Sequence, residues 1–404
     1  MIEILIWSVS FLSLFLSIFW IQVIYTSKKE RKIENINKKI TIIVPAYNEE
    51  KTIAKTLKSL INLNYKNKEV IVVSDSSTDN TEKEVKKFKN VILLRNKHTG
   101  IGKSSAVNKG LKYATGEFIA VVDADSEIEK ESLNYIMHNF EDEAVGAVIS
   151  TIKVRRLNNV YEKLQRIEYM LASFSRTLMS KIDTLHVTPG ALSVYRTHLI
   201  KKLGGFDENN LTEDLEIAMR LKYHGYNIKI AEKAVSYTHV PSTFRSLWHQ
   251  RVRWFRGFIY NTAKYRKMFM SRKHGIMGTF QIPINFTTLI AILLSALIIA
   301  YELVRRSIMF INKFSVLKWE VIPINYDLPS IRDLILGLDI NIAFPLIIAF
   351  LLSVFILHKA HISSNEKWQI SPALLIYFTL YPLLRSLHWI VAFSKETTQS
   401  RKKW

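Results

Sequence analysis

The sequence predicts an α/β domain with a mostly parallel sheet and helices on both faces, set between one amino-terminal and several carboxyl-terminal membrane helices. Short β-rich apolar runs alternate with helical patterns between residues 39 and 240. Long apolar runs stand before and after that region. The formal net charge of +21 suits a protein that lies on an anionic membrane surface or handles anionic substrates.

The composition excludes several kinds of site. The 404 residues include no cysteine, so a disulfide framework, a thiolate nucleophile and a cysteine-ligated zinc or iron–sulfur centre are ruled out. Any metal must therefore bind oxygen or imidazole ligands. Lys and Arg are spread along the chain without a zinc-finger or RNA-recognition motif, and nucleic acid is not an expected partner.

Four apolar runs are long enough to cross a membrane, and they cover Ile4–Tyr25, Phe280–Leu303, Ile340–Leu357 and Pro372–Phe393. Cations at residues 28–32 follow the first run and place the next domain in the cytoplasm. A cleavable signal peptide would carry its positive charge before the apolar core. We therefore interpret residues 1–27 as a retained anchor of a multi-pass plasma-membrane protein.

The topology of the later spans stays open. Four spans would place the carboxyl terminus outside, whereas the cations at residues 401–403 favour the inside. Either Val321–Leu338 enters the membrane or one predicted span is interfacial; otherwise a loop is expected from Arg305 to Asp339. Arg385 and His388, inside the last span, either line a polar path or extend to the interface.

The alternating region supplies a candidate nucleotide site. Four strands are expected, at Lys39–Val44, Glu69–Ser74, Val91–Leu94 and Glu117–Val122, with helical patterns at Glu50–Leu60 and Asp79–Phe88. Ligands of such sheets bind beyond the carboxyl ends of the strands. The polar runs 45–50 and 75–80 follow the first two strands and are expected to hold a nucleotide. Alone, the second run would also fit a turn and a helix cap.

Two acidic clusters lie downstream. Asp123 and Asp125 follow the fourth strand, and a divalent metal that bridges phosphates needs such hard oxygen ligands. Residues 212–214 (Thr-Glu-Asp) open the amphipathic run Leu215–Leu221, where Thr212 is expected to cap a helix. The helix dipole alone would explain both acids without catalysis, and a general base is the alternative.

A Gln-x-x-Arg-Trp box at residues 250–254 lies just before a membrane-grade apolar run. Arginine forms bidentate hydrogen bonds with phosphate, and an indole face suits the apolar face of a sugar. A membrane-interface belt of Trp and Arg is the alternative interpretation. Residues 158–180 similarly show the pattern of an amphipathic interface helix.

In this motif order, from about Lys39 to Gly257, the chain resembles membrane-embedded family 2 glycosyltransferases of GT-A fold, with a Rossmann-like sheet. The group includes processive cellulose, chitin, hyaluronan and poly-N-acetylglucosamine synthases. The resemblance implies an anchor (1–27), a cytoplasmic catalytic domain (39–240), an interface segment (241–275) and a membrane region (276–404). It implies an inverting, metal-dependent enzyme that polymerises a sugar, expected to be N-acetylglucosamine, from a UDP-sugar into a β-linked polysaccharide and translocates it.

The resemblance also implies a role for each motif residue. Asp214 is expected to be the general base, and Asp125 the ligand of Mg²⁺ or Mn²⁺. Substrate is expected to contact the remaining residues: Pro45, Tyr47, Glu49 and Asp75 at the uracil nucleoside, Lys103, Gln250, Arg251 and Arg253 near the diphosphate, Asp123 at the donor ribose or sugar, Trp254 beneath the acceptor sugar, and Glu213 beside the base.

The expected partners are a UDP-sugar donor, a glycan or lipid acceptor, membrane lipids and an accessory membrane subunit. Two other functions stay open. One is a non-processive transferase that adds a single sugar to a membrane lipid. The other is a catalytically silent scaffold or channel subunit, in which loss of the metal or base residues would be expected. Pro189 replaces a residue that is often Ser or Thr in the synthases, which leaves the acceptor's identity open.

Overall fold

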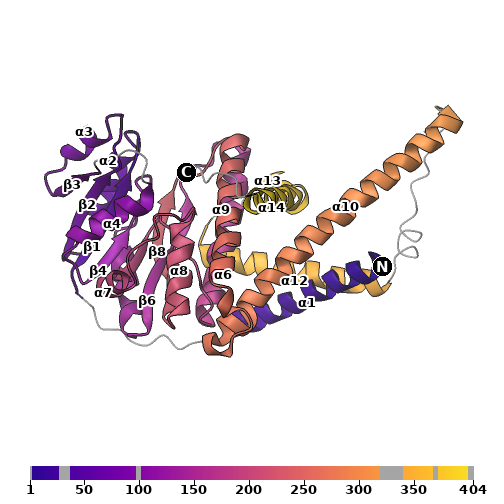
Figure 1. The fold of residues 1–404 in the computed structure, drawn as a ribbon, viewed down its shortest axis with the longest axis horizontal. Coiled ribbons are helices and arrows are strands. Elements are labelled where there is room, and N and C mark those ends of the chain that lie inside the picture. The colour runs from indigo at the N-terminus through magenta and orange to yellow at the C-terminus, as the bar shows by residue number, and fades with distance from the viewer. Residues whose placement is uncertain (1, 27–36, 97–101, 319–339, 367–371, 399–404) are drawn as a thin grey trace. The chain divides into compact units, whose positions relative to one another are not determined.

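A computed structural model describes residues 2–26, 37–96, 102–318, 340–366 and 372–398 (Figure 1). The chain forms two compact units, one from Met1–Ser27 with Ile284–Glu366 and the other from Lys28–Pro283 with Lys367–Trp404. Three features of the topology prediction lie outside the described residues: the cations at 28–32, the segment 321–338 and the cations at 401–403.

The first half of the sheet confirms the four predicted strands, which are β1 (Ile40–Ala46), β2 (Lys68–Ser74), β3 (Val91–Arg95) and β4 (Phe118–Val121). They lie in the order β3-β2-β1-β4, and every pair is parallel. Because side chains alternate across a strand, Ile42 and Val44 pack into the core on one face and Ile43 into the core on the other. Both faces of the sheet are therefore buried.

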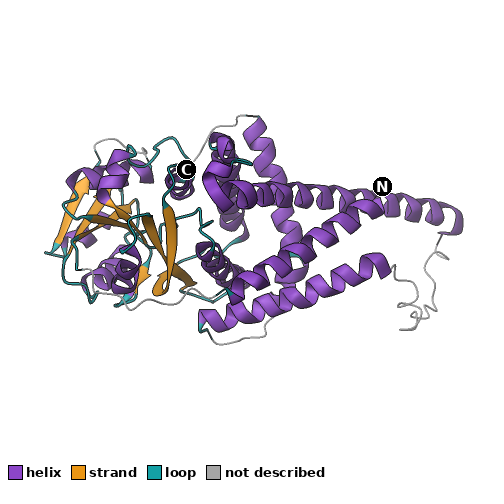
Figure 2. Cartoon of the chain, turned by 90° about the horizontal axis from the view of Figure 1, so that it is seen from below, coloured by secondary structure: helices purple, strands orange, loops and turns teal. Residues whose placement is uncertain are grey.

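Helices cover both faces, as predicted (Figures 1 and 2). One face carries α2 (Ile53–Ile61), α3 (Thr81–Lys86) and α5 (Ser132–Met137), and the other carries α4 (Lys103–Tyr113), α7 (Thr197–Lys202) and α8 (Glu213–Tyr223). Short 3₁₀ turns lie at η1 (His138–Phe140), η2 (Arg266–Met268) and η3 (Arg272–His274), and a π-helical turn at η4 (Met277–Gln281).

The second half of the sheet differs from the prediction. It contains β5 (Glu127–Ile128), β6 (Val145–Val154), β7 (Ser193–Arg196) and β8 (Asn227–Thr238), in the order β7-β6-β8-β5 beyond β4. β7 is antiparallel to both β4 and β6, and β5 is antiparallel to β8. The sheet is therefore mixed, because β7 returns between β4 and β6 and so brings the residues before it to the carboxyl end of β4.

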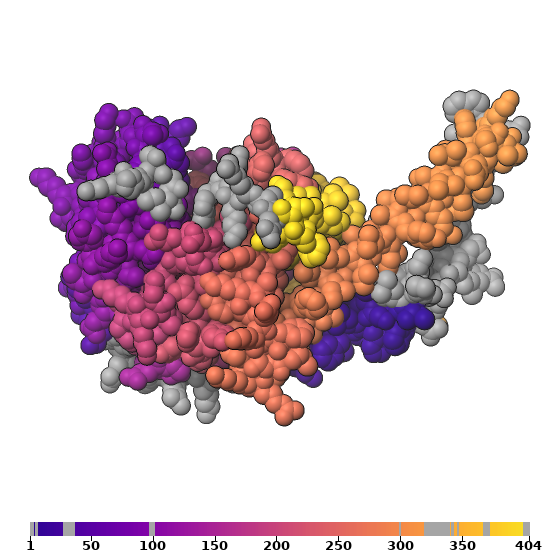
Figure 3. Space-filling view, viewed as in Figure 1, coloured from indigo at the N-terminus to yellow at the C-terminus, as the bar shows by residue number. Residues whose placement is uncertain are grey.

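Four more helices complete this unit: α6 (Val160–Lys181), α9 (Phe244–Lys264), α13 (Pro372–Thr379) and α14 (Tyr381–Thr397). The predicted helix at 158–180 is thus confirmed as α6, and its Leu164 packs with α13 and α14. α14 lies along α9 (Figures 1 and 3), where the Phe255 and Trp389 rings stack with centroids 4.2 Å apart. His388 is fully buried, and its ring packs against Trp248.

Three helices among the described residues are long and apolar enough to cross a membrane, with candidate spans at Trp7–Tyr25, Met277–Leu317 and Ala343–Ser364. They belong to α1 (Ile2–Tyr25), to η4 with α10 (Ile282–Leu317) and to α12 (Ile340–Ser364). α13 and α14, bent by 46°, count as a fourth if they form one span. The loop expected from Arg305 is wrong at its start, because α10 continues to Leu317 and Glu302 pairs with Arg305 one turn on.

A close backbone approach generates a stability prediction at Gly116. A Cβ atom there would lie 2.6 Å from the Thr41 nitrogen and 2.8 Å from the Phe118 oxygen, and neither backbone atom can rotate away. We expect Gly116→Ala to cost about 1–3 kcal/mol of unfolding free energy, as overpacking does. Thermal unfolding of the detergent-purified protein measures the loss. Lys112→Ala, on an exposed face of α4, is the control, and equal midpoints for the two variants would contradict the prediction.

Candidate active site

The carboxyl ends of β1, β2 and β4 lie side by side and end in the predicted polar residues. Tyr47 follows β1 and exposes 55% of its surface, whereas Asp75 follows β2 and is buried. Asp123 follows β4, and its backbone nitrogen donates to the Gly190 carbonyl oxygen at 2.8 Å. That contact follows from the antiparallel pairing of β4 with β7, which sets the residues before Ser193 beside those after Val121.

Lys103 connects two acidic residues from distant parts of the chain. Gly102, with φ of 96°, starts α4 in a conformation that favours glycine, and Lys103 is the first helical residue. Its Nζ lies 2.5 Å from Asp123 Oδ1 and 3.0 Å from Glu213 Oε1. Burial opposes ionisation of the amine, but Asp123, Glu213 and Asp214 outweigh it and raise the pKa of Lys103. The lysine therefore stays charged.

Gly190 packs directly on this ion pair. A Cβ atom at that position would lie 2.5 Å and 2.6 Å from the two carboxylate oxygens of Asp123. The same loop reaches α8, because the Thr188 hydroxyl donates to the Asp214 carbonyl oxygen at 2.7 Å. The loop at residues 188–190 thus joins both acidic clusters, and a side chain at position 190 would have to displace the Asp123 carboxylate.

Asp75, at the end of β2, is held in place by two hydrogen bonds. Its Oδ1 accepts from Asn96 Nδ2 at 2.8 Å, and its Oδ2 accepts from the Gly102 backbone nitrogen at 3.1 Å. The loops after β1 and β2 are also joined, because Thr78 N donates to Asn48 Oδ1 at 2.8 Å. Residues 75–80 thus form a turn that also carries a buried carboxylate. Pro45 is buried in β1, where it pairs with Val73 of β2.

Asp125 is partly buried close to two other carboxylates, Asp123 and Glu49. Burial, and then repulsion by Asp123 and Glu49, raise the pKa of Asp125 to about 7, although Lys103 acts in the opposite direction. Burial is also the main cause that raises the pKa of Glu49, and Asp123 adds to it. Across the described residues, no three His, Cys, Asp or Glu side chains gather to hold a metal ion.

Asp214 is the second carboxylate with a raised pKa. Burial and the neighbouring Glu213 raise the pKa of Asp214 to about 6, while Lys103, the Leu215 backbone N–H and Arg253 lower it. The Leu215 nitrogen donates to Asp214 Oδ1 at 2.8 Å. A carboxylate with this pKa is ionised at neutral pH and is a stronger base than an exposed aspartate.

The side chains of the Gln-x-x-Arg-Trp box lie on two different faces of α9. Gly257 packs so closely on Thr212 that a Cβ there would lie 2.8 Å from Thr212 Cβ. Arg253 is one turn before Gly257 on the same helix face, which agrees with its electrostatic effect on Asp214. This part of the box therefore faces the start of α8.

The other face of the box is buried against α6. Arg251 is fully buried, and its Nη2 donates to Glu168 Oε2 at 2.6 Å. Its guanidinium lies over the Trp254 ring, 4.1 Å from the centroid, and also donates to Gln250 Oε1. Tyr381 of α14 donates to the same Glu168 oxygen at 2.8 Å. Arg251, Gln250 and Trp254 thus form a group separate from Lys103 and Asp123.

The predicted cap of α8 is wrong in one respect. Thr212 is the N-cap residue, but its side chain makes no capping hydrogen bond. Its hydroxyl accepts instead from Asn261 Nδ2 of α9 at 3.1 Å, and Asn261 also bonds to Asn210. The Thr212 hydroxyl therefore connects α8 to α9 through Asn261 and does not cap α8. Here tertiary packing outweighs the local capping preference.

Sequence reasoning missed three residues of this region: Asn96, Glu168 and Tyr381. Asn96 directly follows β3, so the rule that ligands bind beyond strand ends would have found it. Glu168 lies three residues after Gln165 on one face of α6, which is a weak polar signal in an amphipathic helix. Nothing local indicates Tyr381 as its partner.

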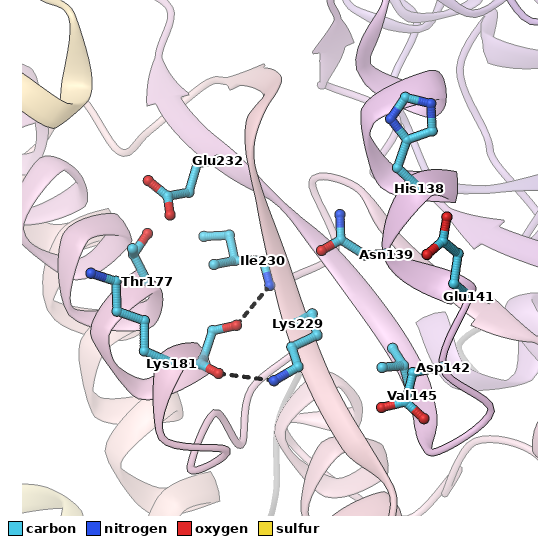
Figure 4. Close-up of a pocket in the computed structure, with 11 residues that line it drawn as sticks. His138, Asn139, Glu141, Asp142, Val145, Thr177, Lys181, Lys229, Ile230 and Glu232 are labelled. Carbon is cyan, nitrogen blue, oxygen red and sulfur yellow. Dashed lines mark hydrogen bonds between the residues drawn. The ribbon is translucent and has the colours of Figure 1, made fainter. Parts of the chain in front are cut away.

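A separate polar hollow of about 550 Å³ lies between the end of α6 and the starts of β6 and β8 (Figure 4). There Ser180 accepts from the Lys229 amine at 3.1 Å and from the Ile230 backbone nitrogen at 3.3 Å. β6 and β8 run in the same direction as β4. Their amino-terminal ends, which line the hollow, therefore lie at the end of the sheet opposite to Asp123, which follows the carboxyl end of β4. None of the predicted site residues lines this hollow.

Residues 41–204 match the family model described as glycosyl transferase family 2. The chain contains a family 2 glycosyltransferase domain. Poly-beta-1,6-N-acetyl-D-glucosamine synthase of Staphylococcus aureus is 31% identical over 266 residues, covering 61% of this chain and 64% of the synthase. The probable glycosyltransferase YdaM of Bacillus subtilis is 34% identical over 258 residues, covering 60% of this chain and 61% of YdaM. The chain thus spans less than two thirds of these curated relatives.

The solved structure of the mannosyltransferase PcManGT from Pyrobaculum calidifontis, in complex with GDP-Man and Mn²⁺, is similar in fold. It aligns with a TM-score of 0.60 and 18% identity, over 98% of this chain and 100% of PcManGT. The glycosyltransferase domain therefore has the GT-A fold, with a mixed sheet in place of the mostly parallel one expected. The range 41–204 that matches the family model contains Asp75, Lys103, Asp123, Asp125 and Gly190.

The largely buried ion pair between Arg251 of α9 and Glu168 of α6 leads to a stability prediction. Arg251→Met should strongly destabilise the protein, by about 3–5 kcal/mol, because it leaves the largely buried Glu168 carboxylate without its ion-pair partner. Denaturant unfolding measures the loss. Adding Glu168→Gln to Arg251→Met should recover part of it, because the uncompensated charge is gone. Equal stability of the single and double variants would contradict the assignment of this pair.

Proposed function

We propose that the protein is an inverting, metal-dependent glycosyltransferase that polymerises N-acetylglucosamine from a UDP donor into a β-linked polysaccharide. The observation that carries the proposal is the bridge from Lys103 to Asp123 and Glu213, with Asp214 directly beside it. A persistently charged amine suits a diphosphate, and an adjacent carboxylate with a pKa of about 6 suits deprotonation of a sugar hydroxyl.

The donor would lie across the carboxyl edge of β1, β2 and β4. Asp75, fixed by Asn96 and Gly102, offers carboxylate oxygens to the uracil ring, and the exposed Tyr47 ring lies at the same edge, with Pro45 and Glu49 beside it. Lys103 starts α4, and helix amino termini favour anions. The diphosphate would therefore lie near Lys103, with Asp123 at the donor ribose or sugar.

Transfer needs one proton acceptor and one leaving group. Asp214 would take the proton of the acceptor hydroxyl as its oxygen attacks the anomeric carbon, while the bond from that carbon to the UDP oxygen breaks on the opposite face. An α-linked donor thus gives a β-linked product, without a covalent enzyme intermediate. Arg253 and Lys103, whose charges both act on Asp214, would offset the charge that develops on UDP.

The residues present fit a divalent cation at Asp125. Its raised pKa reflects burial first and then repulsion from Asp123 and Glu49, and a bound cation would relieve that repulsion. Carboxylate oxygens also suit Mg²⁺ and Mn²⁺. When bound, such a cation neutralises diphosphate charge. Since the described residues supply no three-residue ligand set, phosphate oxygens and water would complete its coordination.

Membrane placement and chain extension complete the proposal. The name of the staphylococcal relative specifies a poly-N-acetylglucosamine product, which supports the same donor and repeated transfer here. The three candidate spans and the α13–α14 pair support a multi-pass protein with a cytoplasmic catalytic domain. The buried group of Arg251, Glu168 and Tyr381 joins α6, α9 and α14. Product translocation across the membrane, with or without an accessory subunit, would follow from that placement.

The decisive experiment measures UDP release and product size from the detergent-purified protein, given UDP-N-acetylglucosamine with Mg²⁺ or Mn²⁺. We expect UDP release to accompany long glycans and to stop on chelation. Asp214→Asn should abolish transfer while leaving UDP binding nearly unchanged, because the amide cannot accept the proton. A singly glycosylated lipid as the product would favour the single-addition alternative, and retained turnover in Asp214→Asn would exclude this residue as the base.

The pH dependence follows from the pKa of Asp214. The base must be ionised, so kcat/KM should fall about tenfold per pH unit below pH 6 and level off above about pH 7. Initial rates between pH 5 and 8 at saturating metal give this profile, since metal saturation removes the effect of protonating Asp125. A flat profile down to pH 5 would contradict a base with this pKa.

A further inference from the structure

We propose that the outer surface of residues 265–282 binds anionic lipid headgroups. This binding would hold α8, the helix that contains Asp214, in its position. This inference rests on the membrane placement of the proposed function, because the chain continues from this segment directly into α10. The segment comprises η2, η3 and η4 with the turns between them. Its two faces differ in composition and in exposure.

The outer face combines cations with exposed apolar side chains. Four cations are exposed, namely Arg266, Lys267, Arg272 and Lys273. Among them Phe269, Met270 and Ile276 expose 46%, 63% and 50% of their surfaces. The sequence contains no Asp or Glu between Lys264 and Glu302 to neutralise these charges. Cations beside exposed apolar side chains are the chemistry that an anionic lipid surface recognises.

The inner face is fixed to α8. Tyr265, Met268 and Met277 are buried in one apolar cluster with Leu215 and Met219 of that helix. The Tyr265 hydroxyl donates to Glu216 Oε1 at 2.6 Å, one turn after the residues that begin α8. At the other end of α8, the Tyr223 ring stacks on His274 with centroids 5.3 Å apart. The segment therefore contacts α8 along its whole length.

The segment is also internally closed. Met270 N donates to the Gly278 carbonyl oxygen at 3.0 Å, and Met270 and Gly275 both have positive φ values of 54° and 55°. A Cβ at Gly278 would lie 2.7 Å from the Met268 carbonyl oxygen, so the two ends of the loop touch. Closure of the loop fixes the backbone from which the cations extend, and the buried cluster connects that backbone to α8.

The electrostatic contribution can be estimated. Each Lys or Arg near an anionic membrane surface strengthens binding about fivefold, and salt weakens this attraction. Replacing the four outer cations by glutamine should therefore weaken anionic lipid binding by more than about tenfold. The cluster of Met268 and Met277 stays intact in that variant, so the fold should persist.

The test compares the full-length protein with two quadruple variants in mixed detergent–lipid micelles. One carries R266Q, K267Q, R272Q and K273Q; the control carries K66Q, K83Q, K86Q and K89Q, which removes equal charge from exposed sites of the catalytic domain. Phosphatidylglycerol and phosphatidylcholine retained per protein after gel filtration are measured by mass spectrometry. UDP binding to each protein confirms that it is folded, and lipid retention does not depend on glycosyl transfer.

We expect the wild type and the control to retain phosphatidylglycerol over phosphatidylcholine, and the 266–273 variant to lose that preference. Phosphatidylglycerol should also raise UDP release several-fold in the wild type and the control but not in the variant. Equal retention by both variants would overturn the lipid surface. Displacement of the lipid by millimolar glycerol phosphate would instead indicate a site for free phosphate. Lost retention with unchanged activation would overturn the coupling to α8.

Discussion

The arrangement of the site depends on one amine. Lys103 holds Asp123, which follows β4, and Glu213, which begins α8. Without a cation between them, these carboxylates and Asp214 would bring like charges together in a partly buried place, which costs free energy. The lysine is itself positioned by Gly102, whose backbone nitrogen is bonded to Asp75. A single backbone turn thus links Asp75, at the end of β2, to the acidic residues around Lys103.

The short box on α9 has two different physical tasks. Arg251 and Trp254, three residues apart, share the face that packs on α6, where burial requires the Glu168 carboxylate as a partner. Arg253 and Gly257, four residues apart, share the face toward α8, where the missing side chain of glycine permits contact with Thr212. The helical period separates these faces, so one motif both anchors α9 and directs a cation toward Asp214.

The sequence predicted those parts of the site that follow from strand ends. Asp75, Asp123 and Asp125 each come directly after a buried β-rich run, and parallel strands end at one edge. It could not predict β7, which has only four residues, or its antiparallel direction, which brings Gly190 to Asp123. Long-range packing also decided the partner of Arg251, since Glu168 and Tyr381 lie 83 and 130 residues away along the chain.

Burial first, and then the balance of charges, explains why Asp125 and Asp214 in one site have raised pKa values. Five acidic residues, Glu49, Asp123, Asp125, Glu213 and Asp214, act on one another here, and Lys103 and Arg253 oppose them. Adding a bare diphosphate would increase this negative charge. Adding a diphosphate with a divalent cation would not, because the cation's charge offsets the phosphates and also lowers the repulsion at Asp125. Under the proposed function, the site would therefore suit a donor that arrives with its cation, while Asp214, next to Glu213 of the Lys103 bridge, would keep the basicity that proton removal requires.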